Sequence, residues 1–118
     1  MTLNDVIREL SAEVLHGNEQ DLATPVTTVA AGDLMSDVLA RAGNADILVT
    51  GLTTTQAIRT ASVASIKTVI IVRGKPVSES IVVLAREEGV LLLLTHQKLF
   101  EACGRLWALG LRQGTEYM

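Results

Sequence analysis

Three polar segments of this sequence each follow a run of apolar residues and carry most of the side chains that could do chemistry. They are TGLTTTQ (50–56), RGKPVSE (73–79) and THQK (95–98). The candidate ligand-binding residues in them are Gly51, Thr53, Thr54, Arg73, Gly74, Lys75, Thr95 and His96. Glycines beside basic and hydroxyl side chains are typical of loops that hold phosphate or carboxylate groups. We therefore expect a small anionic metabolite or a nucleotide as the ligand.

Each of these features also has a purely structural interpretation. Thr53 and Gln56 have the spacing of a capping box, in which both side chains would satisfy N–H groups at the start of a helix. Pro76 is typical of a solvated turn, which would account for the residues around it without a ligand. Asp33 and Asp37 could share a helix face as paired carboxylates, but Asp33 as the N-cap of that helix is the simpler interpretation. The sequence alone leaves the first two pairs of alternatives open.

The standard catalytic signatures are absent. The P-loop spacing fails because residue 69 is Val and Lys75 precedes a proline, and no G-x-G-x-x-G pattern occurs. His16, His96 and Cys103 do not have the spacing of a zinc site, and Cys103 fits a small core residue better than a nucleophile. We therefore predict no catalytic residue, no metal and no cofactor. An enzyme of phosphoryl or acyl transfer is the least favoured alternative.

The elements that must position these segments follow from the apolar pattern. Continuous apolar strands are expected at 46–50, 68–72 and 90–94, and an amphipathic helix follows each of them. The first third adds a helix in 3–10, strands in 12–16 and 25–31, and a helix near 33–42. This order predicts an α/β fold in three α/β/α layers, with a mostly parallel sheet of about five strands and helices on both faces. We expect one domain, 1–118, with the three polar segments at the carboxyl edge of the sheet.

Composition limits the partners. The 118 residues carry a net charge of −3 and a pI near 5.3, so the electrostatic attraction needed for nucleic acid or an anionic membrane is missing. The longest apolar run, 90–94, is too short to span a bilayer. One cysteine excludes an internal disulfide framework. The first residues do not resemble a signal peptide, and we expect a cytoplasmic location.

The last predicted helix has the composition of a subunit interface. Phe100, Leu106 and Trp107 are large for the small core, and Gly104 is costly within a helix unless something packs closely against it. The mean hydropathy of +0.37 points the same way. A homodimer through this helix and a helix that only covers the sheet are equally consistent with the pattern.

Three blocks of the chain resemble the DRTGG-domain family: GDLMSDVLARA (32–42), the stretch from ILVTGLTTTQ to IVRGKP (47–76), and LLLTHQKLFEACGRLWALGL (92–111). The resemblance implies a fold similar to the N-terminal domains of HPr kinase/phosphorylase and of MurF ligases. Family members occur between CBS modules in regulated pyrophosphatases and beside phosphate acetyltransferase domains. The resemblance therefore implies a non-catalytic regulatory or dimerisation module, or a scaffold that docks on a partner enzyme or kinase. No catalytic residue carries over from the family.

Overall fold

The computed structural model describes residues 1–114, so the last four residues of the predicted domain lie outside it. The described helices are α1 (Leu3–Leu10), α2 (Glu19–Leu22), α3 (Met35–Arg41), α4 (Thr55–Val63), α5 (Glu79–Glu88) and α6 (Leu99–Leu109). The described strands are β1 (Glu13–His16), β2 (Thr28–Ala31), β3 (Ile47–Thr50), β4 (Thr68–Ile71), β5 (Leu91–Leu94) and β6 (Arg112–Gln113).

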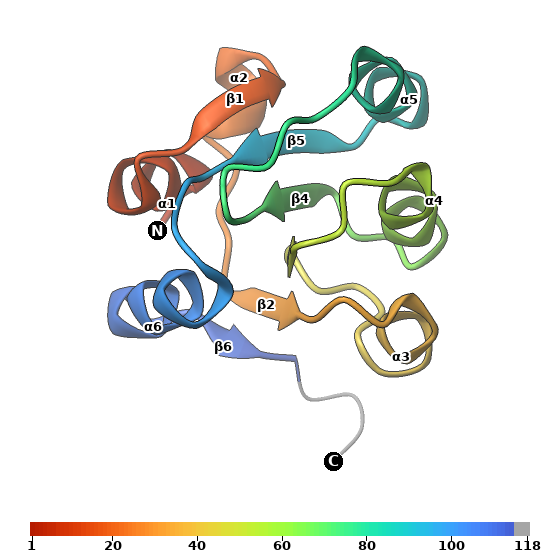
Figure 1. The fold of residues 1–118 in the computed structure, drawn as a ribbon. Helices are drawn as coiled ribbons and strands as arrows, with labels where there is room; N and C mark the ends of the chain where they lie inside the picture. Colours follow the sequence, from red (N-terminus) through yellow and green to blue (C-terminus); the bar gives the residue numbers. More distant parts are fainter. Residues whose placement is uncertain (115–118) are drawn as a thin grey trace.

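The strands form one sheet in the order β1-β5-β4-β3-β2-β6, in which only β1 pairs antiparallel. From β2 to β5 the chain crosses repeatedly in one direction, and crossovers of one hand place α3, α4 and α5 on the same face. The helices α1 and α6 cover the opposite face (Figure 1). The predicted three-layer, mostly parallel α/β architecture is confirmed.

The core lies in two layers because successive strand residues point to opposite faces of the sheet. In β3, Leu48 packs with the layer under α3, α4 and α5, whereas Ile47 and Val49 pack with the layer under α1 and α6. All four residues of β3 and of β4 are buried. This burial on both faces explains why these strands are continuous apolar runs in the sequence.

The structure adds three details to the expected architecture. The sheet has a sixth strand, β6, of only two residues, where about five strands were expected, and a short helix, α2, lies between β1 and β2. In α3 the inward residues are Met35 and Val38, while Leu34 and Leu39 are exposed. The inward side chains of α6 are described with the interface below.

Candidate functional site

The loops after β3, β4 and β5 meet at one edge of the sheet, as the parallel topology predicts. Backbone hydrogen bonds join the last two: the Arg73 N–H donates to the Gln97 carbonyl oxygen at 2.8 Å, and the Gly74 N–H donates to the Thr95 carbonyl oxygen at 2.9 Å. The side chain of Arg73 reaches the loop after β3, as described next. The three predicted segments therefore lie side by side, and the sequence alone could not establish this.

Arg73 lies against the backbone of Gly51. A Cβ atom on Gly51 would collide with Nη2 of Arg73 and lie 3.0 Å from its Cζ. Glycine at position 51 is therefore required for this close approach. Arg73 itself has a φ of 70°, in the left-handed region that few residues other than glycine adopt without cost.

Asp33 joins the site from the loop between β2 and α3. Its Oδ1 accepts hydrogen bonds from the Gly51 N–H at 2.7 Å and from the Thr50 hydroxyl at 3.0 Å. Its Oδ2 lies 3.9 Å from Nη2 of Arg73. The predicted role as N-cap of α3 is wrong, because Leu34 occupies the N-cap position and the Asp33 carboxylate is committed to the neighbouring loop.

The environment of Asp33 favours its charged form. The hydrogen bond from the Gly51 N–H lowers the pKa of Asp33, and the Thr50 hydroxyl acts in the same direction, against the effect of partial desolvation. The positive charges of Arg73 and Lys75 lower this pKa further. Asp33 is therefore an anion in this site, with Arg73 as its nearest cation.

His96 covers Gly74 as Arg73 covers Gly51. A Cβ atom on Gly74 would collide with Nδ1 of His96 and lie 3.0 Å from its Cε1. The side chains of Arg73, Lys75 and His96 are all exposed, and we call these three residues the basic cluster. Beside it, Gln97 contributes a buried Oε1 atom that has no hydrogen-bond partner within residues 1–114, an arrangement that is rare in folded proteins.

Two hydroxyl residues differ from their predicted roles. Thr95 was predicted to bind ligand, but it is fully buried and its hydroxyl donates to the Leu10 carbonyl oxygen at 2.7 Å. Thr95 therefore connects the end of α1 to the end of β5. The capping box of Thr53 and Gln56 is also wrong, because Thr54 is the N-cap of α4 and its side chain makes no capping hydrogen bond. Thr53 is half-buried and Thr54 is exposed at the same sheet edge.

Of the three residues predicted to form an interface on α6, two are exposed and one is buried in the core. The side chains of Phe100 and Trp107 are 92% and 61% exposed, respectively, whereas Leu106 is 2% exposed and belongs to the core. Ala102 is the other buried residue of this helix. Gly104 lies on the exposed stripe between Phe100 and Trp107, and nothing within the described chain lies within 4 Å of the position its Cβ would take.

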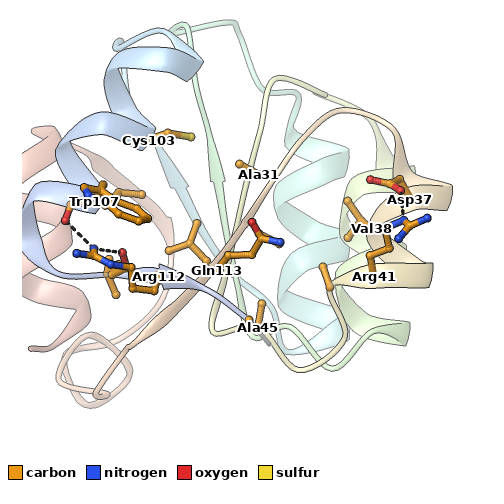
Figure 2. Close-up of a pocket in the computed structure, with 15 residues that line it drawn as sticks. Ala31, Asp37, Val38, Arg41, Ala45, Cys103, Trp107, Arg112 and Gln113 are labelled. Carbon is orange, nitrogen blue, oxygen red and sulfur yellow. Dashed lines mark hydrogen bonds and ion pairs between the residues drawn. The ribbon is translucent and has the colours of Figure 1, made fainter. Parts of the chain in front are cut away.

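A groove that no sequence pattern predicts lies beside α3. It has a volume of about 390 Å³ and opens along β2, between α3 and α6 (Figure 2). Arg112 stacks on the ring of Trp107 at 3.6 Å from the ring centroid and donates from Nη1 to the Trp107 carbonyl oxygen at 2.9 Å. The groove exists because β6 pairs only with the first half of β2, a tertiary feature without a local sequence pattern.

Cys103 lines this groove and is half-buried, and burial raises the pKa of its thiol. A raised pKa keeps the thiol neutral and poorly nucleophilic. Within residues 1–114, no cluster of three or more histidine, cysteine, aspartate or glutamate side chains could hold a metal ion. None of the helices in this part of the chain is long and apolar enough to cross a membrane.

Comparison with known proteins identifies a family and a related structure. The family model of the DRTGG domain matches residues 5–108. The CBS and DRTGG domains of the regulatory region of Clostridium perfringens pyrophosphatase, solved in complex with the activator diadenosine tetraphosphate, superpose with a TM-score of 0.74 at 20% sequence identity. The match covers 89% of this chain and 45% of that one. No curated protein is significantly similar in sequence.

Proposed function

The chain belongs to the DRTGG domain family, and from that premise we propose that it is a regulatory module that binds a small anionic ligand, such as a nucleotide, at the carboxyl edge of its sheet. The observation that carries this proposal is the basic cluster of Arg73, Lys75 and His96, which two adjoining loops present to solvent at one sheet edge. Ligands of open α/β sheets bind at this edge.

The chemistry of the cluster fits a phosphate group. The planar guanidinium of Arg73 matches two phosphate oxygens at once, and the ammonium of Lys75 adds a point charge. The helices α4, α5 and α6 begin next to these loops with no capping hydrogen bond from their N-cap side chains, so free N–H groups add positive potential.

The related pyrophosphatase region supports a regulatory role. That region was solved with a nucleotide activator, and its fold matches 89% of the length of this chain. This chain spans 45% of that region, which also contains CBS domains, so the nucleotide is carried over only as a ligand class. Phosphoryl or acyl transfer is less well supported, because Cys103, a neutral thiol, lies in the groove and not among the loops.

A second candidate function is homodimerisation, or docking on a partner enzyme, through the exposed stripe of α6. Phe100 and Trp107 expose large apolar surfaces, and the position of Gly104 between them has no packing reason within residues 1–114. A glycine between two exposed aromatic side chains would allow the backbone of another chain to approach closely. Interaction with another protein, without any ligand, is the alternative to ligand binding. A single regulatory module can also combine both functions.

Isothermal titration with ATP, acetyl phosphate and diadenosine tetraphosphate tests the proposal. We expect at least one of them to bind the wild-type chain and to lose about tenfold or more in affinity in Arg73→Gly, which also removes the left-handed strain at residue 73. Arg86→Ala is the matched control, because Arg86 lies in the last turn of α5, away from the sheet edge where the loops meet. No binding of the three compounds to the wild-type chain, together with loss of self-association or partner binding in Trp107→Ala, would favour the interaction function.

A further inference from the structure

We propose that the Asp33 carboxylate holds the anion position of the ligand site, and that an anionic ligand binds by displacing it. This inference rests on the proposed function and adds its regulation. The Asp33 carboxylate lies near three kinds of donor that would also serve a phosphate: the Gly51 N–H, the Thr50 hydroxyl and the Arg73 guanidinium. The chain therefore supplies its own anion where a ligand anion would go.

The donors are arranged for an acceptor at this point. The Leu52 N–H donates to Oγ1 of Thr50 at 3.2 Å, so the hydroxyl directs its own proton to Asp33. Thr50 and Gly51 are buried, which fixes both donors at the end of β3. Gly51 brings the Arg73 guanidinium to the same place, since any side chain there would displace it.

The contact between Asp33 and Arg73 is loose enough to exchange. Nη2 and Oδ2 are 3.9 Å apart, beyond hydrogen-bond distance, and the two side chains are 43% and 46% exposed. An ion pair of this kind contributes little to stability because solvent screens it. A ligand phosphate reaches Arg73 from solvent and competes for a guanidinium that Asp33 does not hold tightly.

Displacement of Asp33 has a consequence for α3. Asp33 lies two residues before this helix, and its carboxylate is one link from the β2–α3 loop to the end of β3. The other is the hydrogen bond from the Gly32 N–H to the Val49 carbonyl oxygen at 3.0 Å. Asp37, Val38 and Arg41 of the same helix line the groove (Figure 2). Release of the carboxylate removes a restraint at the start of α3, so occupancy of the ligand site is communicated to the groove.

Titration of ATP into wild-type and Asp33→Asn protein tests the inference. Asparagine keeps an oxygen that can accept from Gly51 and Thr50 but removes the negative charge, so we expect ATP to bind about tenfold more tightly. The gain should disappear when Arg73→Gly is added. Glu87→Gln is the control for net charge, because Glu87 is exposed in the last turn of α5, away from the sheet edge where the loops meet, and it should leave the affinity unchanged.

The outcomes separate this inference from the proposed function. If wild-type protein binds ATP and Asp33→Asn binds it equally or more weakly, the competition by Asp33 is refuted while the ligand site stands. If Glu87→Gln gives the same gain as Asp33→Asn, the effect is one of net charge and the inference is also refuted. If neither wild type nor Asp33→Asn binds ATP, acetyl phosphate or diadenosine tetraphosphate, both the site and its regulation are refuted.

Discussion

The substitution Gly51→Ala is expected to displace Arg73 while leaving the fold intact. The φ angle of Gly51 is not in the left-handed region, so alanine adopts the same backbone conformation. The three atoms nearest to the new methyl group all belong to the guanidinium of Arg73, the far end of a flexible side chain that can move into solvent. Alanine keeps the backbone N–H that donates a hydrogen bond to Asp33, so this substitution acts on Arg73 alone.

The expected change in stability is small. The lost ion pair between Arg73 and Asp33 joins atoms 3.9 Å apart on half-exposed side chains, and such pairs contribute about 0–1 kcal/mol. Alanine restricts the unfolded chain and returns about 0.4–1 kcal/mol where the native backbone accepts it. The two effects nearly cancel, and we expect the free energy of unfolding to stay within about 1 kcal/mol of wild type.

Urea denaturation and ATP titration measure the two quantities separately. We expect an almost unchanged urea midpoint and a loss of about tenfold or more in ATP affinity, because the displaced guanidinium no longer faces the site. Gly43→Ala is the matched control, since the nearest heavy atom to its Cβ would be 4.0 Å away. A loss of more than about 3 kcal/mol in Gly51→Ala would mean that the backbone has to move, and unchanged ATP affinity would mean that Arg73 does not bind the ligand. Either result refutes the reasoning.

Three further predictions concern packing, assembly and pH. Thr95→Val should lower the free energy of unfolding in urea by about 1–3 kcal/mol, because the Leu10 carbonyl oxygen loses a buried donor; an unchanged midpoint would contradict this role. Leu106→Ala should lower the free energy of unfolding by about 2–5 kcal/mol in the same assay, because it leaves a cavity in the core. Trp107→Ala should lower it by less than about 1 kcal/mol and abolish any dimer seen by light scattering. The reverse order of the two losses would contradict the assignment of Leu106 to the core. Since the pKa of Asp33 is lowered from 3.8, its stabilising effect is present above about pH 4 and is lost as the pH falls through its lower folded-state pKa. Asp33→Asn should therefore show a smaller loss of urea stability below pH 4 than wild type, and equal acid losses would argue against the contact.

The sequence was sufficient to predict the central strands of the sheet, because burial on both faces leaves a strong apolar pattern. The segments 46–50, 68–72 and 90–94 contain the uninterrupted apolar runs 47–49, 69–72 and 90–94, and β3, β4 and β5 lie within these segments. The two-residue β6 and the four-residue α2 are too short for any periodicity. Their conformation depends on tertiary contacts, such as the pairing of Arg112 with Thr28.

Apolar side chains were a weaker guide to which face of a helix is buried. Phe100 and Trp107 have the character of core residues, yet both are exposed, while the smaller Ala102 is fully buried. Helical spacing groups residues on a face but does not say which face meets the sheet. That choice depends on how α6 returns from β5 to β6 across the sheet, and it was not available from the local pattern.

The Asp33 contact shows what a local interpretation of the site could not supply. An aspartate just before a helix is most simply an N-cap, because capping needs only neighbouring residues. The register of the sheet decides otherwise: Ala31 pairs with Val49, so the residues two positions further on, Asp33 and Gly51, also lie side by side. Parallel topology predicts that the loops lie at one edge of the sheet, but their convergence and this pairing needed the register.

The position of α3 connects the two functions proposed for this chain. Just before α3 begins, Asp33 is held by the loop after β3, which forms part of the ligand site. Along the helix, Val38 and Arg41 line one wall of the groove, and Trp107 lines the opposite wall (Figure 2). A regulatory domain needs a surface that senses a ligand and a surface that another chain can contact. Ligand binding that frees Asp33 acts on the element that borders both surfaces. Measurement of self-association with and without ATP therefore tests the link directly: it should change in the wild type and become insensitive to ATP in Arg73→Gly.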